Sequence, residues 1–139
     1  MKNKMKLEFI NESCSERFAR MTATAFASIL DPTVEEIAEI KTAVSEAVTN
    51  AIIHGYENCD GLVTLTGEIY DNEIIFWVHD DGCGIEDIER AREALYTGRP
   101  ELERSGMGFS IMECFMDSVS VESSPGKGTT VRMSKVIGK

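Results

Sequence analysis

The stretch VSEAVTNAIIHGY, residues 44–56, contains the pattern that decides the fold of this chain. Its apolar residues recur at the three- and four-residue spacing of a helix that buries one face. Beside that face, Glu46, Asn50 and His54 follow one another at four-residue steps. Side chains four residues apart lie on one helical ridge, so an acid, an amide and an imidazole share one edge of a core helix. Such a ridge is either a solvated helix edge or part of a ligand site.

The residue types on this ridge suit metal and acid–base chemistry. An asparagine oxygen is a neutral ligand for a magnesium ion that keeps waters and phosphates, so Asn50 is a candidate metal ligand. A glutamate can polarise an attacking water or hydroxyl, so Glu46 is a candidate general base. His54 stands nearer the end of the predicted helix, and for it a structural place and a role in the site both stay open.

The composition indicates one globular domain and limits its partners. The 139 residues are enough for a single domain, residues 1–139, with a hydrophobic core. The formal net charge of −10 argues against a general nucleic-acid binder, which neutralises phosphates with lysine and arginine. No apolar run is long enough for a membrane span, and the polar amino terminus is unlike a signal peptide. The four cysteines form no CxxC pair, so we expect reduced thiols and a cytoplasmic protein.

Two helices are predicted in the first part of the chain, each opened by a capping box. Ser13 with Glu16 opens the first, which we expect to reach about Leu30, and Thr33 with Glu36 opens the second. The apolar face predicted for the first helix consists of Phe18, Met21, Ala25 and Ile29. The buried stripe predicted for the second, which ends near Gly55, consists of Ile37, Ile40, Val44, Ala47, Val48, Ala51 and Ile52.

The remaining segments predict the sheet. The predicted strands are residues 6–10, 62–70, 74–80, 118–123 and 129–136. A short turn joins the second and third of them into an antiparallel hairpin, and the last two flank the turn SPGKG. A charged segment and the glycine-led helix SGMGFSIMECFM lie between the two hairpins. This order predicts a two-layer α/β sandwich, in which helices cover one face of a mixed, mostly antiparallel sheet.

Two glycine-rich stretches add ligand-binding features. DDGCGI, residues 80–85, ends a strand with Asp80, whose carboxylate can accept a hydrogen bond from the exocyclic amine of adenine, where guanine presents a carbonyl. In ERSGMGFSIM, residues 103–112, two glycines lead into an apolar helix, and free N–H groups at a helix start attract phosphate. Arg104 stands just before that helix as a fixed cation.

A third stretch, PGKGTT at residues 125–130, lacks the spacing of a Walker A motif and is interpreted as a hairpin turn. The order of all these stretches is more specific than any one of them. SEAVTNAIIHGY, DDGCGI, ERSGMGF and GKGTT in succession resemble the nucleotide-binding boxes of the GHKL, or Bergerat-fold, ATPases. Over its whole length, including FARMTATAF at 18–26, the chain resembles the sporulation type of the bacterial anti-sigma factor kinases in that superfamily.

This resemblance implies a protein that binds and inhibits a sporulation sigma factor. It also implies a serine protein kinase that uses Mg-ATP, leaves ADP, and inactivates an anti-anti-sigma factor by phosphorylation. By motif it makes Glu46 the general base, places Arg104 near the terminal phosphate, and makes Asn50 the magnesium ligand. The nucleotide-binding residues that it implies are Asn50, Asp80, Gly82, Gly84, Ser105, Gly106, Gly108 and Thr129. It implies partner contacts at Arg20, a homodimer, and no direct contact with nucleic acid or membrane.

Other interpretations stay open beside this one. A non-enzymatic sigma-binding module would use the nucleotide only as a structural ligand, and such a module has no need of Glu46. A related stress-response anti-sigma kinase would share the ATP site, so only the match over the whole chain separates it. A detached histidine-kinase catalytic domain would need a phospho-accepting histidine on a helical hairpin, where neither His54 nor His79 lies.

Overall fold

The computed structural model describes residues 3–55, 61–82, 108–124 and 128–138. The elements, in chain order, are β1 (Asn3–Ile10), α1 (Ser15–Ala27), the 3-10 turn η1 (Ser28–Leu30), α2 (Val34–Asn50), the π-helical turn η2 (Ala51–Gly55), β2 (Leu62–Tyr70), β3 (Glu73–Asp80), α4 (Gly108–Phe115), β4 (Ser118–Ser124) and β5 (Gly128–Val136). This order of strands and helices confirms the prediction. The charged segment between the hairpins lies outside the described residues.

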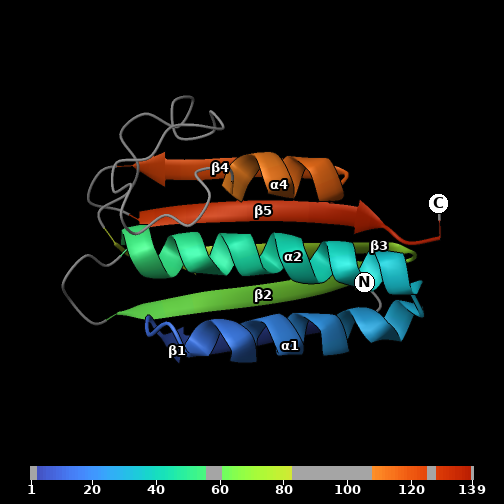
Figure 1. The fold of residues 1–139 in the computed structure, drawn as a ribbon, viewed down its shortest axis with the longest axis horizontal. Coiled ribbons are helices and arrows are strands. Elements are labelled where there is room, and N and C mark those ends of the chain that lie inside the picture. Colours follow the sequence, from blue (N-terminus) through green and yellow to red (C-terminus); the bar gives the residue numbers. More distant parts are fainter. Residues whose placement is uncertain (1–2, 56–60, 83–107, 125–127, 139) are drawn as a thin grey trace.

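The strands form one five-stranded sheet in the order β1-β2-β3-β5-β4. Every pairing among these described strands is antiparallel. The helices α1, α2 and α4 lie side by side over one face of this sheet (Figure 1). The two-layer α/β sandwich with helices on one face is therefore confirmed. None of the described helices is long and apolar enough to cross a membrane.

The hairpin of β2 and β3 forms where alternating apolar residues meet a two-residue turn. Tyr70 pairs with Glu73, which leaves Asp71 and Asn72 in the turn. Asp71 has a φ of 51°, in the left-handed region that aspartate and asparagine tolerate better than most side chains. Alternate residues of the two strands point toward the helices, and the fully buried ones among them are Val63, Leu65, Ile69, Ile74, Phe76 and Val78.

The helix α2 begins at the predicted cap and carries the predicted core stripe. The Thr33 hydroxyl accepts a hydrogen bond from the Glu36 N–H at 3.0 Å, and the Glu36 carboxylate accepts one from the Thr33 N–H at 2.9 Å. Ile37 and Ile52 pack partly buried against the core. The other members of the predicted stripe are buried: Ile40, Val44, Ala47, Val48 and Ala51. Helical backbone continues through η2 as far as Gly55, the predicted end.

The helix α1 turns a different face to the core from the one predicted. Phe18 and Met21, both expected on the buried face, have exposed fractions of 55% and 62%. The residues of α1 that are buried are Ala19, Ala23, Phe26 and Ala27. Small alanine side chains let the helix backbone lie close to the sheet, and the Phe26 ring fills the space above Gly67. A Cβ atom at Gly67 would stand 2.8 Å from that ring.

The ends of α1 also differ from the prediction. Cys14 is the N-cap residue and makes no side-chain capping bond, so the predicted capping box of Ser13 with Glu16 is wrong. Ser13 contributes only its carbonyl, which accepts a hydrogen bond from the Glu16 N–H at 3.3 Å. The α-helix ends at Ala27, and the tighter 3-10 turn that follows breaks the spacing that had predicted Ile29 as buried.

Candidate functional site

Three elements bring their ends together at one end of the molecule, on the left in Figure 1. The carboxyl-terminal ends of α2 and β3 meet the amino-terminal end of β5 there, and α4 begins further inward along the sheet. The strand register pairs Asp80, the last residue of β3, with Thr129 at the start of β5. The turn η2, which continues α2, contacts both of these strands. The end of the predicted ridge and the described parts of two glycine-rich stretches, residues 80–82 and 128–130, therefore lie at this end of the sheet.

Asp80 is a buried carboxylate at the centre of this end, with 3% of its surface exposed. Its Oδ1 atom accepts a hydrogen bond from the backbone N–H of Gly82 at 3.0 Å. Burial raises the pKa of Asp80 above its usual range, although the backbone N–H groups of Gly82 and Thr129 and the nearby His79 oppose the shift. The site thus holds a desolvated acceptor, the kind of group that binds a ligand's N–H donor tightly.

Thr129 is held beside Asp80 by a hydroxyl pair. Its own hydroxyl lies 2.8 Å from the Ser123 hydroxyl on β4, and the latter donates to the Gly128 carbonyl at 3.2 Å. Thr129 is 8% exposed, so this hydroxyl pair involves a buried residue, whose backbone N–H also faces the Asp80 carboxylate. Ser123 had no role in the sequence analysis, because its partnership with Thr129 depends on the register of β4 with β5.

Gly128 is a second residue that sequence reasoning missed. Its φ of 86° lies in the left-handed region, and a Cβ atom there would stand 2.0 Å from the Asp80 carbonyl oxygen. Only glycine lets β5 start this close to the end of β3. The signal that could have found it is the glycine placed directly before the predicted strand in GKGTT.

Glu46 and Asn50 lie on α2 in partly buried positions, one helical turn apart, and Asn50 is the last residue of the α-helix. The next residues form the π-helical turn η2, a rare backbone form that is concentrated at functional sites. His54 falls inside η2, so the four-residue spacing of an α-helix no longer applies to it. The ridge predicted from the sequence is thus a regular helical ridge for Glu46 and Asn50 alone.

The glycine-led helix is confirmed as α4, which begins at Gly108 and packs against α2. The predicted site residues Gly84, Arg104, Ser105 and Gly106 lie outside the described residues. Within the described ranges, histidine, cysteine, aspartate and glutamate side chains form no cluster that could hold a metal ion.

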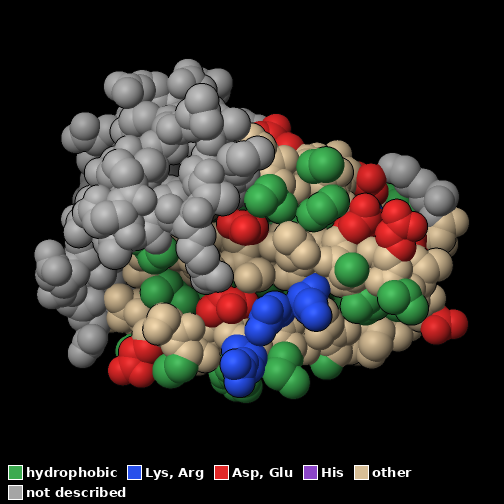
Figure 2. All heavy atoms as spheres, in the orientation of Figure 1, with side chains coloured by type: hydrophobic (Ala, Val, Ile, Leu, Met, Phe, Trp, Pro, Cys, Tyr) green, Lys and Arg blue, Asp and Glu red, His purple; other side chains and the backbone are tan. Residues whose placement is uncertain are grey.

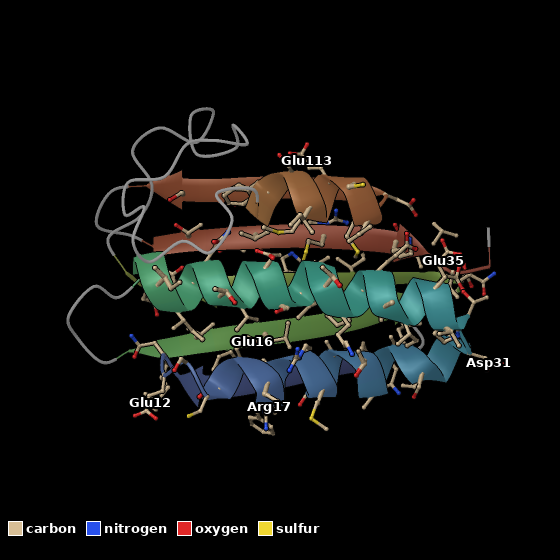
Figure 3. All side chains as sticks on the ribbon, viewed as in Figure 1. Glu12, Glu16, Arg17, Asp31, Glu35 and Glu113 are labelled. Carbon is tan, nitrogen blue, oxygen red and sulfur yellow. The ribbon has the colours of Figure 1, made fainter. Side chains whose placement is uncertain are left out.

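The predicted partner residue Arg20 lies on α1. Its Nε atom is 3.4 Å from Glu16 Oε2, and its side chain is 31% exposed. The lysines and arginines of α1 and α2 are Arg17, Arg20 and Lys41, and Figure 2 shows one basic patch over these two helices. In Figure 3, Arg17 lies on the outer side of α1 and Glu16 on the side nearer α2.

The sequence matches the Histidine kinase-like ATPase domain family over residues 12–135. It is 60% identical over 135 residues to the anti-sigma F factor of Clostridium acetobutylicum, covering 97% of this chain and 94% of that one. It is 56% identical over 140 residues to the anti-sigma F factor of Bacillus subtilis, covering 100% and 96%.

Among solved structures, the fold is similar to that of the RsbU and RsbW domains of Rv1364c from Mycobacterium tuberculosis, with a TM-score of 0.71 and 17% identity. The likeness covers 98% of this chain, which spans only 32% of that longer one, and it concerns the fold alone. With the family match and the relatives, the identity is plain: this chain belongs to the anti-sigma F factors, within the histidine kinase-like ATPase domain family.

Proposed function

We propose that this chain is both an anti-sigma factor and a serine protein kinase. It binds and inhibits sigma factor F, and it uses Mg-ATP to phosphorylate and inactivate an anti-anti-sigma factor in the cytoplasm. The observation that carries the proposal is the buried Asp80 carboxylate, which lies at the same end of the fold as Glu46 and Asn50. A desolvated acceptor at the same end of the fold as a helical acid–amide pair suits a nucleotide whose phosphates are to react.

The nucleotide would enter with its base against the end of the sheet. Asp80 has two carboxylate oxygens, and Gly82 occupies a lone pair of one of them. The remaining acceptor capacity suits the exocyclic amine of adenine, with the Thr129 hydroxyl beside it. The phosphates would then run toward the amino terminus of α4, where Gly108 begins the helix. The sequence motif adds Gly84, Arg104, Ser105 and Gly106 to this phosphate-binding part.

The chemistry needs positioning and charge neutralisation more than covalent help. A magnesium ion brought by the nucleotide would offset phosphate charge, and the Asn50 side-chain oxygen is a fitting neutral ligand for it. One turn earlier on α2, Glu46 would accept the proton of the attacking serine hydroxyl. Arg104 would offset charge on the transferred phosphate. The protein thus supplies a base, a metal ligand and a cation around the phosphate that moves.

The helix α1 is the proposed docking surface for protein partners. Phe18 and Met21 leave more than half of their surfaces in solvent, and Arg20 lies on the same helix. Exposed apolar side chains next to charged ones are typical of protein–protein contacts. We assign Arg20 to contacts with the sigma factor and the anti-anti-sigma factor, and we propose a homodimer. Arg20→Glu should weaken capture of sigma factor F, whereas Lys4→Glu, on the other face of the sheet, should not.

Phosphate transfer tests the enzymatic part of the proposal. The purified protein, magnesium and γ-labelled ATP are incubated with the anti-anti-sigma factor, and with a version whose acceptor serine is replaced by alanine. Label that appears only on the serine-containing partner is the expected result. Tight ATP binding without any transfer would contradict the kinase and leave a nucleotide-dependent sigma-binding module.

A further inference from the structure

His79 stands directly behind the adenine-recognising end of β3, on the opposite face of the sheet. Successive side chains of a strand point to opposite faces, so Asp80 points to the helices and His79 to the open face. Its Nδ1 atom lies 2.7 Å from the Thr130 hydroxyl oxygen, and its Nε2 atom lies 2.7 Å from Asp81 Oδ1. One ring thus joins β3, the start of β5 and the residue that follows β3.

Both partners of His79 are chain neighbours of groups at the nucleotide site. Thr130 follows Thr129, the buried threonine beside Asp80. Asp81 precedes Gly82, whose N–H donates to the Asp80 carboxylate at 3.0 Å. Any movement of the turn after β3, or of the start of β5, would therefore displace the partners of that carboxylate.

The chemistry of the partners fixes the hydrogen positions on the ring. A carboxylate only accepts hydrogen bonds, so Nε2 carries the hydrogen that is donated to Asp81. In the neutral ring Nδ1 then accepts the hydrogen of the Thr130 hydroxyl, and in a charged ring it would donate to the same oxygen. The bridge exists in both protonation states, so it acts as a mechanical link.

The side chain of His79 is partly exposed to solvent, so we expect its hydrogen bonds to affect the geometry of the site more than the stability of the protein. The side chains of His79 and Asp81 are 39% and 76% exposed. Exposed pairs of this kind contribute little to the free energy of unfolding. The position of the bridge, at the junction of three backbone segments, matters more for the geometry of the Asp80 turn.

We propose that His79 is a positioning residue of the nucleotide site, which holds the turn from Asp80 to Gly82 against β5 from the far face of the sheet. This inference rests on the proposed nucleotide-binding role of Asp80. The family resemblance gave His79 no role, because its partners come from the strand register and the turn.

Nucleotide affinity and thermal stability, measured side by side, test the proposal. His79→Ala should bind Mg-ADP and Mg-ATP about three- to tenfold more weakly than the wild type, the effect of one ordinary hydrogen bond. Its melting temperature should stay close to that of the wild type. Thr130→Val should weaken binding in the same direction, and His79→Gln should restore part of the affinity because its amide both donates and accepts.

The matched control is Thr64→Ala. Thr64 pairs with His79 from the β2 side, on the same open face, and should leave the affinity unchanged. Hydrogen exchange of the Gly82 amide in the nucleotide-free protein gives a second readout, and it should speed up in His79→Ala. Unchanged affinity and unchanged exchange would overturn the inference and leave the proposed function standing. A wild-type protein that binds no adenine nucleotide would overturn both.

Discussion

Two carboxylates that lie near opposite ends of α2, Glu36 in its first turn and Asp80 at the end of β3, are in opposite situations. At the amino-terminal end, Glu36 accepts hydrogen bonds from the backbone N–H groups of Gly138 and Thr33, both at 2.9 Å. These bonds, that of Gly138 first, lower the pKa of Glu36 below its usual range. At the carboxyl-terminal end, burial raises the pKa of Asp80 despite its bond from Gly82. The fold stabilises the charged form of Glu36 and destabilises the charged form of Asp80.

Other polar groups near Glu36 are also paired within the fold. Lys135, 9% exposed, donates to the Phe115 carbonyl at 2.9 Å and pairs with Glu39 at 3.2 Å. At that end of the molecule, Lys135 connects the last residue of α4 to α2, and Gly138 is hydrogen-bonded to Glu36 of α2. At Asp80, by contrast, burial outweighs the backbone N–H groups of Gly82 and Thr129 and raises the pKa, a kind of perturbation that is concentrated at functional sites. The two carboxylates therefore differ in whether the fold favours or disfavours their charged form.

The largest expected effect is on the rate of phosphate transfer, and it should differ between two glutamates of α2. Glu46→Gln should lower the rate of phosphate transfer by about 10²–10⁴-fold, because an amide cannot take the serine proton. ATP affinity should be retained, as measured by titration calorimetry. Glu35→Gln, at the other end of α2 and exposed, is the control and should change neither quantity. Loss of ATP binding in Glu46→Gln would instead make Glu46 a structural residue.

The next effect compares two glycines with positive φ, one near each carboxylate. Gly128→Ala should lower the free energy of unfolding by about 2–5 kcal/mol, from left-handed strain plus the overlap with Asp80. Gly138 has a φ of 80° and nothing within 4 Å of its Cβ position. Gly138→Ala should therefore lose only the strain, about 1–2 kcal/mol. Chemical denaturation measures both, and equal losses would contradict the close approach of β5 to β3.

A third comparison uses pH. The pKa of Asp80 in the folded protein lies above its ordinary value of 3.8. Folding therefore disfavours the charged carboxylate, and above the folded pKa this lowers the free energy of unfolding. Asp80→Asn should therefore be more stable than the wild type near neutral pH, and the gain should vanish as the pH falls toward 3.8. An asparagine offers one acceptor oxygen instead of two, so the gain in stability should accompany weaker nucleotide binding.

Glu36→Gln should behave in the opposite sense. The folded pKa of Glu36 lies below 4.5, so its contribution to stability is present above that pH and is lost as the pH falls through the folded pKa. The variant should be less stable than the wild type at neutral pH, with the difference disappearing in acid. Melting temperatures recorded over a pH series test both variants, and shifts of the same sign would refute the contrast between the two carboxylates.

The smallest effect concerns the cap of α2. Thr33→Ala removes the hydroxyl that accepts the Glu36 N–H and should lower the free energy of unfolding by about 1 kcal/mol. Nucleotide affinity should not change, because this cap lies at the far end of α2 from Asp80. Thr33→Ser keeps the hydroxyl and should retain most of the stability. An affinity change in Thr33→Ala would show that the two ends of the helix are coupled.

The sequence predicted the fold correctly where a single pattern of apolar and turn residues was present. The stripe of α2, its Thr33 cap and the hairpin of β2 with β3 were predicted correctly, because periodicity and turn residues agreed there. The face of α1 was predicted wrongly, because two apolar stripes competed and the core took the one with small alanines. Sequence spacing favoured the larger side chains, Phe18 and Met21, which remain exposed.

The site was predictable only in its motif residues. Asp80 and the pair Glu46 and Asn50 came from the motifs, and the structure places them at one end of the fold. The contacts of Gly128, Ser123 and His79 depend on the register of β3, β4 and β5. The sequence predicted the hairpins but did not fix the register of every strand pair, so these contacts needed the structure.

The most direct measurement is the affinity of the wild-type protein for Mg-ATP and Mg-GTP under identical conditions. If Asp80 recognises the base, ATP should bind at least about tenfold more tightly, because guanine presents a carbonyl to a carboxylate that needs a donor. Asp80→Asn should reduce this preference. Equal affinities for the two nucleotides would contradict the assignment of the buried carboxylate to the adenine amine.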